Sequence, residues 1–205
     1  MLTCFMAGCG DKAWHETTDE QGVVTFTCTE GECDHNNAFL NTAQVRQSTN
    51  QRFNVKDWGG WLSDSGSCLS TMEQFLIRTS QIEPTFTSDG CRVVAGEWYV
   101  DNQRISLRKD LKVAHIVPPF WAFKHGARAW SAKDKSAFFN DKENLILLSK
   151  SESRERKNQG PSKWLPSNSD KRCHYLNSWS ELVEGYNLTS LTENQYIESS
   201  LNNCR

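Results

Sequence analysis

A histidine near the end of an apolar run constrains the fold of this chain most. Residues 111–119 read L-K-V-A-H-I-V-P-P. A β-branched run stopped by proline predicts a short strand that ends in a turn. His115 then lies near the strand end, where its side chain is fixed and still reaches solvent. A second apolar run, residues 145–148, begins directly after Asn144, and a charged segment follows it.

The spacing of these residues resembles a known pattern. A histidine ends a strand, an Asn-Leu pair opens the next apolar run, and a third residue stands on a helix nine positions after the asparagine. His115, Asn144 and Ser153 occupy these positions, and the flanking words HIVPPFWAFKHGARAW, FFND and PSKWLP agree in order. The chain is therefore similar to HNH (His-Me finger) endonucleases, in particular to secreted members related to the C-terminal domain of GmrSD restriction endonucleases. The resemblance covers residues 51–205.

The resemblance implies a fold, an activity and a set of residues. The fold is α+β, with a ββα-metal (HNH) core surrounded by helices and disulfides. The activity is metal-dependent hydrolysis of phosphodiester bonds, with DNA as the expected partner and Mg²⁺ as the expected cofactor. His115 corresponds to the general base that deprotonates a water, and Asn144 and Asn140 hold the loop of the base. Alternatively, Asn140 caps the short helical turn that follows it.

The two positions that hold the divalent ion in this family fall on Ala114 and Ser153. Alanine has no donor atom, and a neutral hydroxyl is a poor anchor for a hard cation. On a helix, Glu152 and Glu155 point about 100° and 200° away from Ser153, so neither replaces it. We therefore expect weak metal binding and low nuclease activity.

A second class of function stays open beside the nuclease. The chain is then a catalytically degenerate HNH homologue that binds nucleic acid or a protein partner. Ala114 and Ser153 favour this alternative. So does Met72, which stands where the family has an arginine and which we interpret as a core contact. Fold alone does not decide between the two classes.

A basic cluster follows the second apolar run. Arg154, Arg156, Lys157 and Lys163 are predicted to contact the phosphates of a nucleic-acid backbone. The formal net charge of the chain is −2, so no global field indicates such a partner. The alternative is a solvated helix face without a ligand.

The N-terminal segment indicates export. The word M-A-G-C within residues 1–11 resembles a bacterial lipobox, which predicts a lipid on Cys9 that attaches the chain to a membrane. The alternative is a merely apolar N-terminus, because only eight residues precede Cys9 and none is basic. Residues 12–50 form a polar extension. No other segment is long and apolar enough to span a bilayer. The expected location is the bacterial periplasm, cell surface or medium.

The chain has eight cysteines, an even number that favours disulfides in an oxidising compartment. Spacing suggests three pairs, Cys28–Cys33, Cys68–Cys91 and Cys173–Cys204, although cysteine spacing does not determine connectivity. One alternative is a set of free, buried thiols in a cytosolic protein. Another is a partial metal site made of Cys28, Cys33 and His35.

Three local expectations complete the analysis. Residues 92–94 and 98–100 flank Ala95-Gly96-Glu97, which predicts a hairpin. His125 before Gly126 is predicted to end a helix, with a second catalytic group as the alternative. The aromatic residues between the motifs are predicted to lie in the core, with a base-stacking platform as the alternative. They are Phe120, Trp121, Phe123 and Trp130.

Overall fold

The structure is a computed structural model that describes residues 14–18, 24–28, 52–100 and 102–204. The chain divides into two units, residues 1–51 and 52–205. In the first unit, β1 (Trp14–Thr18) pairs antiparallel with β2 (Val24–Cys28). Cys9, Cys33 and His35 lie outside the described residues, and with them the predicted Cys28–Cys33 pair, the Cys28–Cys33–His35 site and the lipid on Cys9.

The second unit begins with the 3₁₀ helix η1 (Val55–Trp58), the helix α1 (Thr71–Thr79) and a three-stranded antiparallel sheet. The Ser70 side chain caps α1 by accepting a hydrogen bond from the Glu73 amide. The sheet has the order β3-β4-β5. Its strands are β3 (Thr85–Phe86), β4 (Val93–Val100) and β5 (Gln103–Leu107).

The hairpin predicted around residues 95–97 is wrong, because this stretch is one continuous strand, β4. Gly96 does not turn the chain. A Cβ there would lie 2.6 Å from the Trp98 indole and 2.8 Å from the Ser80 hydroxyl, so glycine makes room for a close contact. The actual hairpin joins β4 to β5, and Asn102 takes the positive φ of 62° that its turn requires.

Within the second unit, a strand pair followed by a helix comes next. The short 3₁₀ helix η2 (Arg108–Asp110) leads into β6 (Leu111–His115), which pairs antiparallel with β7 (Leu145–Ser149). The helix α4 (Lys150–Arg156) follows β7 directly and begins with a reciprocal capping box between Ser149 and Glu152. The strand that ends at His115 is therefore confirmed.

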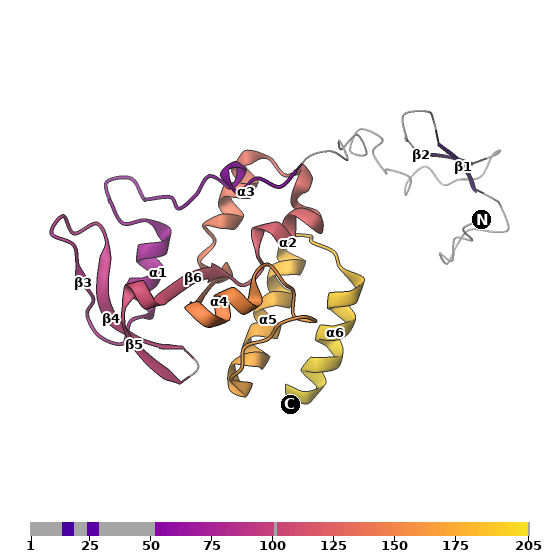
Figure 1. Cartoon of the computed structure of the whole chain (residues 1–205). Coiled ribbons are helices and arrows are strands. Elements are labelled where there is room, and N and C mark those ends of the chain that lie inside the picture. The colour runs from indigo at the N-terminus through magenta and orange to yellow at the C-terminus, as the bar shows by residue number, and fades with distance from the viewer. Residues whose placement is uncertain (1–13, 19–23, 29–51, 101, 205) are drawn as a thin grey trace. The chain divides into compact units, whose positions relative to one another are not determined.

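Helices fill the connection between the two strands and the C-terminal part. The connection carries α2 (Pro119–Lys124), η3 (Ala127–Ala129), α3 (Ala132–Phe139) and η4 (Lys142–Asn144). The C-terminal part carries α5 (Ser169–Gly185), α6 (Leu191–Leu201) and η5 (Asn202–Cys204). Figure 1 shows α5 and α6 lying beside α2 and α4, with the sheet β3-β4-β5 and α1 on the other side of β6.

Two hydrophobic cores lie on either side of the β6–β7 pair. The larger is rich in aromatic residues and centres on Trp58, Trp121, Phe138 and Trp179. The smaller lies between α1 and the three-stranded sheet, around Leu76 and Trp98 among others. The expectation that the aromatic set is core is confirmed for Trp121 and Phe123, which are both buried, whereas Trp130 is half-buried.

Two disulfides close loops of the second unit. Cys68 pairs with Cys91, and Cys173 pairs with Cys204. Both predicted pairs are confirmed, and the free-thiol alternative is wrong for these four residues. The fold is thus α+β with disulfides. In the described part of the chain, no helix combines the length and apolar character needed to cross a membrane.

Candidate functional site

The His115 side chain is packed inside the protein at the end of β6. Only 8 % of the residue is exposed, which differs from the predicted access to solvent. Its Nε2 lies 2.8 Å from the carbonyl oxygen of Phe139. Since a carbonyl oxygen can only accept, Nε2 carries the hydrogen. The other ring nitrogen, Nδ1, has no partner among the described residues and so presents a lone pair.

Burial keeps this imidazole neutral. Desolvation disfavours the charged ring and lowers the pKa of His115 from 6.5 to about 4, and the positive charge of Arg156 acts in the same direction. The hydrogen bond to the Phe139 carbonyl and the charge of Asp141 oppose the shift. At neutral pH, His115 is therefore a proton acceptor rather than a cation.

A tryptophan from a distant loop covers His115. The Trp61 ring stacks on the imidazole at an interplanar angle of 5° and a centroid distance of 5.3 Å. Asn140 holds the loop of Trp61 on both sides. Its Oδ1 accepts from the Leu62 amide at 2.8 Å, and its Nδ2 donates to the Gly60 carbonyl at 2.9 Å. Asn140 thus acts on His115 through Trp61.

Asn140 does not cap the following helical turn. The residue ends α3, and Asp141 caps η4 by accepting from the Glu143 amide. Of the two interpretations of Asn140, the cap is therefore wrong. Its contacts fit the other interpretation, a residue that holds the surroundings of His115.

Asn144 fixes the chain directly after His115. It is fully buried, its Oδ1 accepts from the Val117 amide at 2.8 Å, and its Nδ2 donates to the Val117 carbonyl at 3.3 Å. Its own carbonyl accepts from the Ile116 amide at 2.6 Å. One asparagine therefore satisfies both backbone groups of Val117 and sets the turn that closes β6.

Arg156 belongs to the interior and not to the surface cluster in which we placed it. Only 2 % of the residue is exposed. Its guanidinium donates to the Ile116 carbonyl and lies over the rings of Trp164 and Tyr175. This arrangement braces the turn after His115 and leaves no face for a phosphate backbone.

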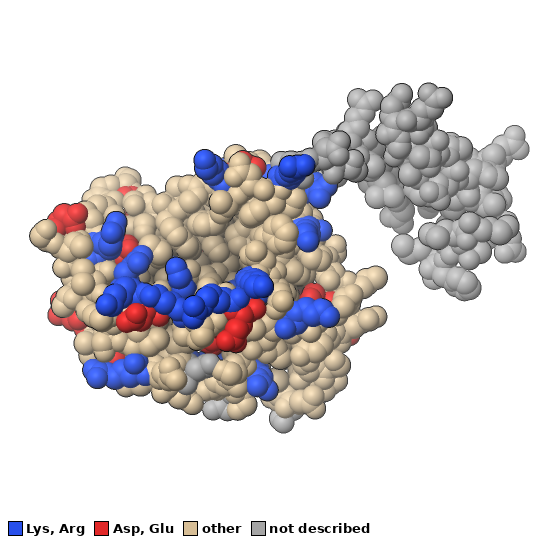
Figure 2. All heavy atoms as spheres, viewed as in Figure 1, with Lys and Arg blue, Asp and Glu red and all other residues tan. Residues whose placement is uncertain are grey.

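The other basic residues of the cluster are on the surface. Arg154, Lys157 and Lys163 are exposed. Figure 2 shows a row of Lys and Arg side chains crossing this face of the molecule, with acidic side chains next to it. The strand β6 adds the exposed Lys112 to the same region, and Lys150 lies 3.7 Å from Asp110. The charge of this row is partly offset by the neighbouring acidic side chains.

The residues at the expected metal positions do not fit a divalent ion. Ala114 pairs with Ile146 in the strand ladder, and Ser153 is half-buried on α4. The Glu152 side chain accepts a hydrogen bond from the Ser149 backbone amide in the capping box. Among the described residues, no group of three His, Cys, Asp or Glu side chains is placed to hold a metal ion. A hard cation needs several oxygen ligands, so this donor set is insufficient.

His125 ends α2, as predicted. Its backbone amide donates to the Ala122 carbonyl, its Nδ1 lies 2.7 Å from the Trp121 carbonyl, and its ring stacks on Trp121. Met72 is half-buried, and its sulfur lies 3.5 Å from the guanidinium of Arg108.

Sequence reasoning missed the two residues that touch His115 most closely, Trp61 and Phe139. Trp61 is distant in the chain, and Phe139 contributes a backbone carbonyl, which no side-chain pattern reveals. The FFND word did mark the segment, because it contains both Phe139 and Asn140.

Comparison with known proteins gives one informative relative. An uncharacterized secreted protein of the fungus Arthroderma benhamiae is 29 % identical to this chain over 150 residues, which cover 70 % of this chain and 72 % of that protein. No protein-family profile matches the chain. No solved structure matches it either.

Proposed function

We propose that the β6–β7–α4 unit is an HNH-type core and that the chain hydrolyses phosphodiester bonds of nucleic acid slowly, with His115 as general base. The state of His115 carries this proposal. Its Nε2 hydrogen is committed to the Phe139 carbonyl, its pKa is about 4, and Nδ1 has no partner in the described part of the chain. A fixed, neutral imidazole can accept a proton from water, but a pKa of about 4 makes it a weak base, which is a further reason to expect slow hydrolysis.

The surroundings of His115 support the proposal, because three elements position the ring. Asn144 sets the turn after it, Asn140 holds the loop of Trp61, and Arg156 braces the Ile116 carbonyl. General bases contribute only when they are held in place, since a displacement of about 1 Å can cost roughly 100-fold in rate. The exposed Arg154, Lys157 and Lys163 would hold the backbone of DNA nearby.

The missing metal donors limit the expected rate. A divalent ion would polarise the phosphate and stabilise the leaving oxygen. Ala114 offers no ligand for one, and Ser153 offers a single neutral hydroxyl. General-base catalysis alone contributes about 10²–10⁴-fold, far less than efficient nucleases need. Hydrolysis by this chain is therefore slow.

The lack of metal donors at Ala114 and Ser153 favours a second candidate function. The chain is then an HNH homologue that has lost hydrolysis and binds nucleic acid or a protein. Burial of His115 under Trp61 also favours this function, because the ring stack then serves packing. The two candidates differ in whether His115 is needed for any cleavage.

Cleavage of plasmid DNA by purified wild-type and His115→Ala proteins separates them. We expect slow nicking by the wild type and a loss of at least about 100-fold in His115→Ala. His125→Ala is the matched control. This histidine also stacks on a tryptophan, and the proposal gives it no part in the chemistry. Equal nicking by wild type and His115→Ala would reject His115 as the base.

A gain-of-function variant tests the explanation for slow hydrolysis. The double change Ala114→Asp with Ser153→Asn supplies donors at both expected metal positions. We expect it to raise Mg²⁺-dependent cleavage well above the wild-type level, with EDTA as the control. An inactive double variant would favour the binding function. Brisk wild-type cleavage that EDTA abolishes would place a metal on residues other than these.

We further propose that the chain is exported and that a lipid on Cys9 anchors it. Disulfides form and persist in oxidising compartments, the described part of the chain has two, and its fungal relative is described as secreted. Mass spectrometry of the native protein's N-terminus tests the anchor. A diacylglycerol adduct on Cys9 supports it, and an unmodified Cys9 in membrane-free protein contradicts it.

A further inference from the structure

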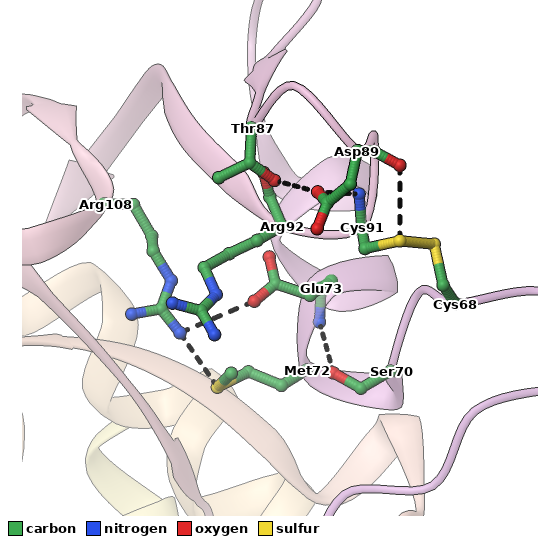
Figure 3. Close-up of a pocket in the computed structure, with 9 residues that line it drawn as sticks. All are labelled: Cys68, Ser70, Met72, Glu73, Thr87, Asp89, Cys91, Arg92 and Arg108. Carbon is green, nitrogen blue, oxygen red and sulfur yellow. Dashed lines mark hydrogen bonds and ion pairs between the residues drawn. A yellow bond between two sulfur atoms is a disulfide. The ribbon is translucent and has the colours of Figure 1, made fainter.

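A polar hollow lies at the opposite end of β6 from His115. Its volume is about 580 Å³, and Figure 3 shows the residues that line it. They come from α1 and the segment before it, from the loop between β3 and β4, and from η2. The Cys68–Cys91 disulfide joins two of these segments at the wall of the hollow. This position is separate from His115 and its neighbours.

Two arginines enter the hollow from different elements. Arg92 reaches it from the segment before β4, and Arg108 reaches it from η2. Figure 3 shows dashed lines from the Arg108 guanidinium to the Glu73 and Met72 side chains, and none from the Arg92 guanidinium. Two cations at one hollow repel each other unless an anion lies between them.

The carboxylates at the hollow already accept hydrogen bonds from the protein. Glu73 is buried and accepts from the Val93 amide at 2.8 Å, and its second oxygen lies 3.5 Å from Arg108. Asp89 accepts from the Thr87 hydroxyl and from the Cys91 amide. These hydrogen bonds, followed by the Arg92 charge, lower the pKa of Asp89.

The two guanidinium groups still have free donors. The Arg92 residue is exposed, and its side chain forms no hydrogen bond or ion pair with the residues that the structure describes. The Nε of Arg108 is shielded from solvent and has no hydrogen-bond partner within the described chain. A buried donor without a partner costs about 1–3 kcal/mol. An oxyanion reached by a small rotation of this guanidinium would supply the partner.

We propose that this hollow binds a phosphate group between Arg92 and Arg108. Each planar guanidinium matches two oxygens of a phosphate, which a lysine cannot do. The volume leaves room for a nucleoside beside the phosphate. The phosphate belongs either to a free nucleotide or to a strand of nucleic acid. In the second case the inference rests on the proposed function, because the hollow then extends the contacts of the substrate beyond His115.

Calorimetric titration of the full chain at constant ionic strength tests the proposal. The probes are inorganic phosphate, adenosine 5′-monophosphate, adenosine and a short single-stranded oligonucleotide. We expect saturable binding of inorganic phosphate and the monophosphate, and none of adenosine. Arg92→Gln should weaken the binding of inorganic phosphate and of the monophosphate by at least 10-fold. Arg108→Lys, which keeps the charge that faces Glu73, should weaken them too.

A matched control separates a site from a general loss of charge. Arg104→Gln removes the same charge from an exposed arginine that pairs with Glu97, away from the hollow. Its phosphate affinity should stay within 2-fold of wild type. Equal weakening by Arg104→Gln and Arg92→Gln would overturn the proposal, as would binding of adenosine as tight as that of its monophosphate.

Two further outcomes identify the source of the phosphate. Oligonucleotide binding that Arg92→Gln weakens supports the proposal and assigns the hollow to a strand. Binding of the small phosphates alone supports it and assigns the hollow to a free nucleotide. Failure of every phosphate-bearing probe to bind overturns it. The titration repeated with His115→Ala should give unchanged phosphate affinity, so this test and the cleavage test fail independently.

Discussion

The two ends of β6 differ in almost every physical property. At its start, Arg108 and Arg92 face an open polar hollow, and their donors are incompletely used. At its end, His115 is enclosed by aromatic rings and held by a backbone carbonyl. Leu111 belongs to the small core, whereas Ile116 belongs to the large aromatic one. One short strand thus connects the hollow that we propose as a phosphate site to the histidine that we propose as a base.

Because of this difference, we expect the end at His115 to tolerate few substitutions. A group that must stay neutral is kept so by burial, and burial requires every nearby backbone group to be paired. Asn144 and Arg156 meet that requirement at Val117 and Ile116. The Arg92 side chain is exposed, so we expect a substitution there to change the proposed phosphate binding far more than folding.

The largest effect is expected at the His115 end. Asn144→Ala leaves the buried amide and carbonyl of Val117 without partners, at a cost of about 1–3 kcal/mol each. We expect the free energy of unfolding in urea to fall by about 4 kcal/mol. Asn158→Ala, at an exposed position after α4, is the control and should change it by less than about 0.5 kcal/mol. Equal effects of the two changes would contradict the structure of the turn.

The next effect concerns the wall of the hollow. The Cys68–Cys91 disulfide spans 23 positions, and closing a loop of this length stabilises a protein by about 3.5 kcal/mol. Replacing both cysteines by serine should lower the free energy of unfolding by about that amount and weaken phosphate binding. The control is the same change at Cys173 and Cys204, which span 31 positions. It should destabilise similarly and leave phosphate affinity unchanged. Unchanged phosphate affinity in both variants would separate the disulfide from the hollow.

A smaller effect appears as a dependence of stability on pH. The pKa of His115 is about 4 in the folded protein and about 6.5 when the chain unfolds. Between these values the unfolded chain binds a proton that the folded chain does not, so stability falls as the pH is lowered from 6.5 toward 4. The expected loss from this group is on the order of 3 kcal/mol. Urea unfolding of wild type and His115→Gln over this range measures it. Equal slopes would show that His115 is not desolvated.

The smallest effect belongs to Arg92. Its side chain is exposed and makes no hydrogen bond within the described chain, so Arg92→Gln should change the free energy of unfolding by less than about 0.5 kcal/mol. The same variant is the one expected to lose phosphate. A destabilisation comparable to that of Asn144→Ala would mean that Arg92 serves the fold.

Local sequence signals were sufficient for much of this fold. The β-branched run before Pro118 predicted β6, and cysteine spacing predicted both disulfides of the described chain. The strand signal depends on residues that are adjacent in the chain, whereas the two disulfides join residues 23 and 31 positions apart. The β4–β5 hairpin was misplaced because glycine marks both turns and close packing, and Gly96 serves packing.

The candidate site was predictable only in part. His115 and Asn144 were found from their spacing, but the burial of His115 depends on Trp61, which lies on a separate loop. Arg156 was assigned to the surface because its neighbours are charged. Its position one turn after Glu152 on α4 was the available sign of a shared inward face, since both residues are buried. No signal in the sequence shows that Arg92 and Arg108 line the same hollow, because tertiary packing places them there.

The protonation state of His115 tests most directly the claim that the end of β6 holds a fixed, neutral base. Nitrogen-15 NMR of histidine-labelled protein, with His115→Gln to assign the resonances, reports the pKa and the position of the ring hydrogen. We expect His115 to be neutral from pH 5 to 8, with its hydrogen on Nε2 and a pKa of about 4. A pKa near 6.5, or a hydrogen on Nδ1, would contradict the role of His115 as a desolvated proton acceptor.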